Sequence, residues 1–320
     1  MNDALHMPPI IKTALNNDWL HVFVVNNPVF AMLARMLMAA YGVNQDNVIC
    51  IPRRNADCTL VSDHVFVPKN RFYYRFFSKQ LCDHISARQI ITEVERHKKG
   101  FLVYGSWMYQ WIEELASAKY CHGHIYLEEG QAAYYDSQPY AVSEANRWAD
   151  RNKRLRQGDT RWYYRQDAEA FFGLMESSFP LAPAEKVFTL SNFSDCADLY
   201  QPKLKGIRSI GVMPAPGRLT QDSWVAALEQ MALKMPEGGV IKLHPGFTMI
   251  PGAKALLEAT LKDFSGDKIT LCADDVVLEL EMLVEKKSFF GSRSSVSRYA
   301  EHFGSTYEYL DFSGYVQPKN

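Results

Sequence analysis

Short apolar runs alternate with longer amphipathic stretches along most of the chain. The short runs are rich in β-branched residues and predict buried strands. These strands are expected at residues 20–25, 47–52, 61–68, 100–104, 124–127, 209–213, 239–243, 269–272, 288–290 and 308–311. Apolar residues spaced three and four apart predict helices over residues 29–41, 86–98, 107–118, 221–235, 253–264, 276–286 and 296–303. Alternating strands and helices indicate an α/β protein with parallel sheets covered on both faces.

The alternating pattern breaks once, between about residues 180 and 205, and then restarts. Pro180 and Pro183 punctuate the start of this break, and residues 184–204 resemble a crossover. We therefore predict two Rossmann-like, doubly wound domains that face a cleft, at residues 1–185 and 186–320. A length of 320 residues agrees with about two domains.

The composition excludes several classes of partner. The chain has 35 basic and 36 acidic residues, a net charge of -1, so it has no global field for holding nucleic acid or an anionic membrane. Its 6 cysteines are scattered without a CxxC pair and are expected to be reduced. The segment Cys121-His122-Gly123-His124 is the one zinc candidate that the sequence shows, and it lacks a partner cluster.

The N-terminal residues contain no signal peptide, and no apolar stretch reaches the length of a membrane span. We expect a cytoplasmic protein, with attachment to the inner face of a membrane and a homodimer left open. Residues 146–165 are rich in Arg, Lys and aromatic side chains. This stretch is either a solvated helix with a basic face or a surface for an acidic acceptor or anionic lipid headgroups.

Three short polar pieces follow predicted strands, where doubly wound sheets bind their ligands. The first is Glu128-Glu129-Gly130, after the strand at residues 124–127. A glutamate at a cleft can accept a proton from an attacking hydroxyl, and Gly130 permits a tight turn or the close approach of a ligand. The alternative is a pair of solvated acidic side chains at a turn, which would have the same sequence. Either Glu128 or Glu129 could be the base.

The second piece is His244-Pro245, after the strand at residues 239–243. Histidine can donate a proton or hydrogen bond to a leaving phosphate near neutral pH. Lys242 lies two residues earlier and therefore on the same face of the strand. The alternative is a histidine whose hydrogen bonds are satisfied at a strand end.

The third piece is Ser294-Ser295, which precedes a predicted helix. Its hydroxyls and the free N–H groups of the first helical turn favour phosphate binding, and Arg293 and Arg298 add positive charge. Ordinary helix capping by serine is the alternative. The loop that begins at Gly211 is a weaker place for a nucleotide. The chain has no P-loop, no GxGxxG fingerprint and no DxD pattern at a predicted strand end, which favours chemistry without a metal or other cofactor.

Together these motifs resemble those of the bacterial sialyltransferases, including the lipooligosaccharide and capsule enzymes. The resemblance spans most of the chain in order and spacing. It implies a GT-B fold, a CMP-sugar donor held mainly by the second domain, and inversion at the anomeric carbon of the sugar. It favours Glu128 over Glu129 as base and makes His244 the acid or phosphate partner. Donor-binding residues would be Gly130, Lys242, Pro245, Gly211, Ser294, Ser295 and a ribose-binding Glu281, with Glu279 as its rival.

The resulting hypothesis is an inverting, metal-independent transferase that moves sialic acid from CMP-sialic acid to a cell-surface glycan acceptor. Transfer of Kdo or another nonulosonic acid from its CMP form is a near alternative. A second class is a CDP-alditol phosphotransferase of teichoic-acid type, which also resembles a GT-B fold with His-Pro and paired serines. A third is a non-catalytic nucleotide-sugar binder.

Overall fold

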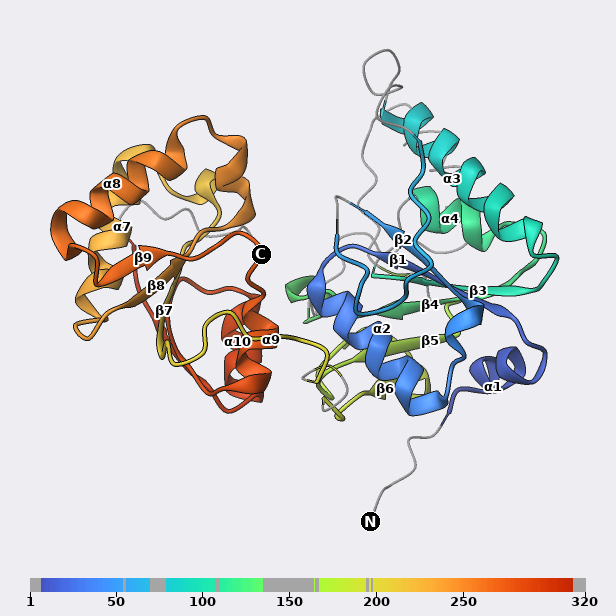
Figure 1. Ribbon diagram of the computed structural model, residues 1–320. Helices are drawn as coiled ribbons and strands as arrows, with labels where there is room; N and C mark the ends of the chain where they lie inside the picture. Colours follow the sequence, from blue (N-terminus) through green and yellow to red (C-terminus); the bar gives the residue numbers. More distant parts are fainter. Residues whose placement is uncertain are drawn as a thin grey trace. The chain divides into compact units, whose positions relative to one another are not determined.

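The chain divides into two compact units, Met1–Leu199 and Tyr200–Asn320. The computed structural model describes residues 7–53, 56–69, 79–106, 110–134, 164, 167–193, 196 and 198–312. Each unit contains one parallel sheet with helices on both faces (Figure 1), which confirms the predicted class of two doubly wound α/β domains. The units are described separately below.

The first sheet has six parallel strands in the order β2-β1-β3-β4-β5-β6. The strands are β1 (Leu20–Val25), β2 (Val48–Pro52), β3 (Phe101–Gly105), β4 (Cys121–Leu127), β5 (Ala170–Gly173) and β6 (Val187–Thr189). The helices among the described residues of this unit are α1 (Pro9–Asn16), α2 (Pro28–Tyr41), α3 (Lys79–Arg96) and α4 (Gln110–Ala116), with short 3-10 turns η1 (Gln45–Asn47), η3 (Gln131–Tyr134) and η4 (Ala184–Lys186).

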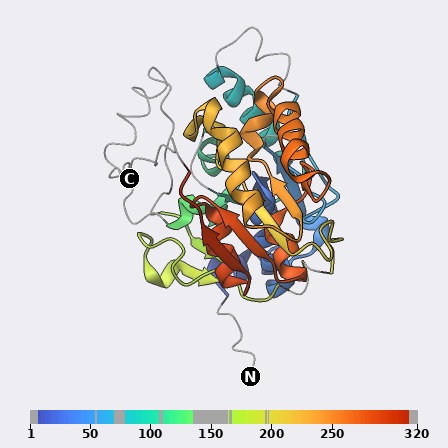
Figure 2. The same ribbon diagram turned by 90° about the vertical axis from the view of Figure 1, so that its left-hand side faces the viewer.

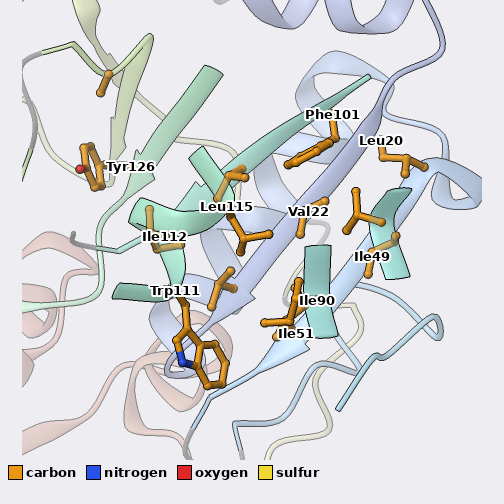
Figure 3. Packing of buried hydrophobic residues seen from close by; sticks show 14 of the residues in the cluster. Leu20, Val22, Ile49, Ile51, Ile90, Phe101, Trp111, Ile112, Leu115 and Tyr126 are labelled. Carbon is orange, nitrogen blue, oxygen red and sulfur yellow. The ribbon is translucent and has the colours of Figure 1, made fainter. Parts of the chain in front are cut away.

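Strand β1 is central and completely buried, which explains its unbroken apolar sequence. Alternate residues point to opposite faces. Leu20, Val22 and Val24 face α3 and α4, where they share a core with residues such as Ile90 and Ile112 (Figure 3). On the other face Tyr41, at the end of α2, packs edge-on against Phe172 of β5.

The second sheet has five parallel strands in the order β11-β10-β7-β8-β9. They are β7 (Ser209–Val212), β8 (Gly239–Lys242), β9 (Ile269–Leu271), β10 (Ser288–Gly291) and β11 (Thr306–Tyr309). The helices are α7 (Gln221–Leu233), α8 (Ala253–Ser265), α9 (Leu278–Val284) and α10 (Ser295–His302), with the 3-10 turns η5 (Pro216–Arg218) and η6 (Pro245–Met249). Helices α7 and α8 lie side by side on one face (Figures 1 and 2), and α9 and α10 cover the other.

The structure differs from the sequence prediction in several places. The expected strand at residues 61–68 contains one isolated bridge, between Cys50 and Val65. Strands β5 and β6 were not predicted. Because β6 pairs with β5 in the first sheet, residues 187–189 belong to the first unit, and the division falls at 199/200 rather than at 185/186.

Two sequence interpretations concern the surface. The basic and aromatic stretch at residues 146–165 lies outside the described residues except for Tyr164, whose ring packs against Tyr126, Phe171 and Phe179. Each helix in the described part of the chain is too short or too polar to cross a bilayer.

A buried histidine in β1 makes the stability of the first unit depend on pH. His21 is 1% exposed, and its Nδ1 shares a hydrogen bond of 2.7 Å with the hydroxyl of Tyr104. Burial lowers the pKa of His21 from 6.5 to about 4. The unfolded chain therefore takes up a proton first as the pH falls. The stabilisation is complete above pH 6.5 and is lost between pH 6.5 and 4.

We expect this group to remove about 2 kcal/mol of unfolding free energy between pH 8 and pH 5. Denaturant unfolding of the wild type and of His21→Gln over this range measures the effect. The variant should be less stable at pH 8 but lose about 2 kcal/mol less on acidification. His122→Gln, at an exposed position, should keep the wild-type pH dependence. Equal pH dependence in wild type and His21→Gln would contradict the assignment.

Candidate functional site

Both sheets have a switch point at which the strand order reverses, and ligands of doubly wound folds bind at the carboxyl edge there. In the first sheet the reversal lies between β1 and β3, and in the second between β7 and β10. The loops that follow these strands hold polar residues in both units. Each carboxyl edge is therefore a candidate site in its own unit.

Glu128 follows β4 and is completely buried. Its Oε1 accepts a hydrogen bond from the hydroxyl of Tyr134, and its Oε2 accepts bonds from the backbone N–H of Leu174 at 2.9 Å and from Ser178 Oγ at 2.8 Å. The carboxylate is thus enclosed by donors of its own chain. It ties the end of β4 to η3 and to the turn after β5, and it is a positioning residue.

Gly173 makes this enclosure sterically feasible. A Cβ at this last residue of β5 would lie 2.3 Å from Ser178 and 3.0 Å from Oε2 of Glu128. Only a residue without a side chain leaves room for the serine and the carboxylate.

Glu129 is partly exposed and belongs to a different hydrogen-bonded group. Its Oε2 accepts a bond of 2.9 Å from Nδ2 of Asn26, and the same Nδ2 also donates to Ser106 Oγ. Asn26 follows β1 and Ser106 follows β3, so this group straddles the switch point of the first sheet. Oδ1 of Asn26 is buried and accepts no hydrogen bond from the described residues. Asn26, Ser106 and Glu129 are referred to below as the first-sheet cluster.

Asn27 and Gly130 hold the cluster in place. Oδ1 of Asn27 caps α2 by accepting from the N–H of Phe30 at 3.0 Å, while its Nδ2 donates to the carbonyl of Glu129 at 2.6 Å. Gly130 has a φ of +128°, in the region that favours glycine, and lets the chain turn from Glu129 into η3.

The predicted serines lie at the switch point of the second sheet. Ser294 is the N-cap residue of α10, and its buried Oγ makes no hydrogen bond within the described residues. Ser295 is the first residue of the helix and is partly exposed. A Cβ at Gly291 would lie 2.4 Å from the carbonyl oxygen of Val212, so glycine allows β10 to end close against β7. An uncapped helix start with an unused hydroxyl is suited to an anion.

His244 is exposed at the end of β8, where it caps η6. Its Nδ1 accepts a hydrogen bond of 3.0 Å from the N–H of Gly246, so the neutral ring carries its proton on Nε2. Pro245 occupies the first position of η6. A Cβ at Gly246 would lie 3.0 Å from Pro216, which shows that the loops after β7 and β8 touch.

Lys242 and Glu279 lie near the same edge. Nζ of Lys242 donates to the carbonyls of Ala273 and Asp274 at 2.8 and 2.9 Å, and burial lowers the pKa of this amine. Burial raises the pKa of the Glu279 carboxyl, opposed by a backbone hydrogen bond and by the charge of Lys242. Lys242 therefore fixes the loop after β9.

Two residues predicted to bind the donor are enclosed by the protein. Glu281 is completely buried and accepts hydrogen bonds from the hydroxyl of Tyr200 at 2.6 Å and from the N–H groups of Lys203 and Leu204 at 2.7 and 3.0 Å. It anchors the segment that enters the second unit. Gly211 lies inside β7, where a Cβ would meet Ile241 and Met231 at 2.9 and 3.0 Å. This glycine packs under α7 rather than in a ligand loop.

The sequence thus predicted residues that lie at the carboxyl edge of each sheet. It did not distinguish the exposed side chains from those that the protein encloses. Sequence reasoning missed Asn26, Asn27 and Ser106 as members of the first edge. The signal that could have found them is the N-cap asparagine before a proline at N1, directly after a buried strand.

No protein-family model matches this chain, and no curated protein matches it significantly. Solved structures do match it. MnaA from S. aureus, solved with UDP, has a TM-score of 0.53 at 13% identity, over 92% of this chain and 80% of that chain. UDP-GlcNAc 2-epimerase from Methanocaldococcus jannaschii has a TM-score of 0.50 at 11% identity, over 91% and 84%. A candidate UDP-N-acetylglucosamine 2-epimerase from Listeria monocytogenes gives 0.52 at 12%, over 92% and 80%. At such identities the likeness establishes the fold.

These comparisons contradict the resemblance to bacterial sialyltransferases. The structures named above are UDP-GlcNAc 2-epimerases and a UDP complex, and no family model supports a sialyltransferase. Sialic acid transfer from CMP-sialic acid is therefore withdrawn, together with its CMP- and CDP-based alternatives and its link to lipopolysaccharide or capsule synthesis. The physical reason is that parallel strand ends gather polar and glycine residues in any doubly wound nucleotide fold. The three motifs therefore indicate the doubly wound fold and do not identify the sugar-nucleotide donor.

The hydrogen bonds predict effects of very different size on stability for substitution of the two adjacent glutamates. Glu128→Ala leaves buried donors without an acceptor and should lower the unfolding free energy by about 3 kcal/mol. Glu129→Ala removes a partly exposed carboxylate and should change it by less than about 1 kcal/mol. Denaturant unfolding of both variants measures the difference. A stable Glu128→Ala protein would show that the enclosure does not contribute as described.

Proposed function

We propose that this chain is an enzyme that acts on a UDP-sugar and binds the diphosphate at the carboxyl edge of the second sheet. The observation that carries the proposal is Ser294, a buried hydroxyl without a hydrogen bond in the described chain, at the start of α10 and at the switch point between β7 and β10. The likeness of the fold to a UDP-bound protein and to UDP-GlcNAc 2-epimerases supports the choice of nucleotide.

The geometry of the edge suits a diphosphate. Free N–H groups in the first turn of α10 and the dipole of the helix favour negative charge. Strands β8 and β10 lie on either side of β7, so their ends are about 10 Å apart. A nucleoside diphosphate can extend over that distance, from Ser294 and Ser295 to His244.

The chemical role of this edge is stabilisation of a leaving group. When water or another hydroxyl bonds to the sugar C1, or a proton leaves C2, the bond between C1 and the diphosphate oxygen breaks. Its electron pair stays on the diphosphate, which gains negative charge. The Nε2–H of His244 and the start of α10 can both donate to that charge.

Nucleotide binding tests the proposal directly. Isothermal titration with UDP should show binding, and CMP should bind at least about tenfold more weakly. His244→Ala and Ser294→Ala should each weaken UDP binding by about tenfold, which corresponds to about 1.4 kcal/mol. His302→Ala and Ser265→Ala change the same residue types elsewhere in the second unit and should bind UDP as the wild type does.

Absence of UDP binding at millimolar concentration, or equal affinity in all four variants, would overturn the nucleotide assignment. Turnover is a separate measurement, in which UDP-GlcNAc is incubated with the protein and followed by proton NMR. A new sugar-nucleotide or free UDP is the expected result. Unchanged UDP-GlcNAc would contradict an enzyme that acts on this sugar-nucleotide.

A further inference from the structure

The fold brings together three potential metal ligands in the first unit that are not adjacent in the sequence. His64 lies after β2, while Glu93 and His97 lie at and just beyond the end of α3. One ligand atom from each of the three lies within 4.8 Å of the other two. We propose that His64, Glu93 and His97 form a binding site for a divalent transition-metal ion of the zinc class.

The backbone holds these residues in place from two sides. Glu93 and His97 are four residues apart, which puts them on the same side of a helix. His64 is fixed because its carbonyl accepts a bond of 3.0 Å from the N–H of Cys50 in β2, and Phe66 donates back to the carbonyl of Cys50 at 2.8 Å. The rings of His64 and His97 have centroids 5.9 Å apart. Closure around an ion therefore needs side-chain rotation rather than backbone movement.

The donor set and the distances fit zinc. Two imidazoles and one carboxylate are ligands that Zn²⁺ accepts, with a fourth position left for water or another group. In a tetrahedron with bonds of about 2.0–2.1 Å, ligand atoms lie about 3.3–3.4 Å apart. The present separations of up to 4.8 Å are larger by about the amount that a change in χ angles supplies.

Metal binding at Glu93 must break or rearrange its ion pair with Arg96. Oε2 of Glu93 accepts from Nη1 of Arg96 at 2.7 Å, and the Arg96 side chain is 70% exposed. Exposed pairs of this kind contribute little stability, and the carboxylate has a second oxygen. Competition from Arg96 is therefore weak.

A cavity borders the proposed site at Glu93. It has a volume of about 550 Å³, and its wall also includes the basic side chains of Lys69, Arg88 and Arg96. Because three of these side chains are basic, they favour an anion such as hydroxide or chloride as the fourth ligand of the metal. A bound ion would pin the segment around His64 to the end of α3.

The sequence could not reveal this site. The only cluster it showed was Cys121-His122-Gly123-His124, whereas within the described residues it is His64, Glu93 and His97 whose ligand atoms converge. The ligands are separated by residues 65–92, so ligand spacing alone gives no motif. The proposal is also independent of the nucleotide assignment, because it uses other residues and another ligand.

The test uses the full chain after removal of metal with a chelator. Zn²⁺ is titrated in competition with a chromophoric chelator, and Co²⁺ is used as a spectroscopic probe. We expect one site with a Kd of about 1 µM or below and a Co²⁺ spectrum of nitrogen and oxygen ligation without thiolate charge transfer. The double variant His64→Gln/His97→Gln should bind at least about 30-fold more weakly. His84→Gln, on the same helix but outside the ligand group, should bind normally.

Thermal unfolding provides a second readout by mass action on the folded state. Zn²⁺ should raise the Tm of the wild type and of His84→Gln but not that of the double variant. The metal-free wild type and double variant should unfold at the same temperature, because His64 is exposed and the substitutions leave the core unchanged. Unaltered Zn²⁺ affinity in the double variant, a thiolate spectrum, or no binding at 100 µM Zn²⁺ would overturn the proposal.

Discussion

The buried carboxylate of Glu128 is the interaction on which the edge of the first sheet depends. It accepts hydrogen bonds from Tyr134, Ser178 and the backbone of Leu174, and so joins three segments that come from both sides of the undescribed residues 135–163. Burial of such a group is unfavourable unless every acceptor site has a partner, so the surrounding loops have little freedom to rearrange. Glu281 has the same role in the second unit, where it accepts from Tyr200 and the backbone of Lys203 and Leu204.

Fixed loops separate residues that support the edge from residues that are available for chemistry. In the first unit Glu128 holds the loops at the edge of the sheet in place. Glu129 remains partly exposed and forms a hydrogen-bonded group with Asn26 and Ser106. In the second unit Glu281 holds the entering segment in place. His244 is exposed, and the hydroxyl of Ser294 makes no hydrogen bond within the described residues. Both sets of available groups lie at or beside a topological switch point, where a doubly wound sheet leaves room between diverging loops. The topology of the sheets, more than any short motif, indicates where ligands bind.

The class of fold could be predicted from the sequence because buried parallel strands such as Leu20–Val25 are uniformly apolar and amphipathic helices follow them. The strands β5 and β6 escaped prediction because they are short and lie among prolines and irregular segments. The segment at residues 61–68 alternates like a strand but contributes only the bridge at Val65. At the sites, sequence placed Glu128, His244 and Ser294 at strand ends correctly. It could not show that Glu128 and Glu281 are enclosed, because their donors come from residues such as Ser178 and Tyr200, far away in the chain.

Hydrogen exchange of the backbone in wild type and Glu128→Gln tests the central claim most directly. The substitution keeps the size of the side chain but replaces one carboxylate acceptor with a donor, so the bonds to Tyr134, Ser178 and Leu174 cannot all persist. The account predicts faster exchange at residues 128–134 and 173–178, with unchanged exchange in β7, β8 and β10 of the second unit. Unchanged protection at residues 128–134 and 173–178 would contradict it.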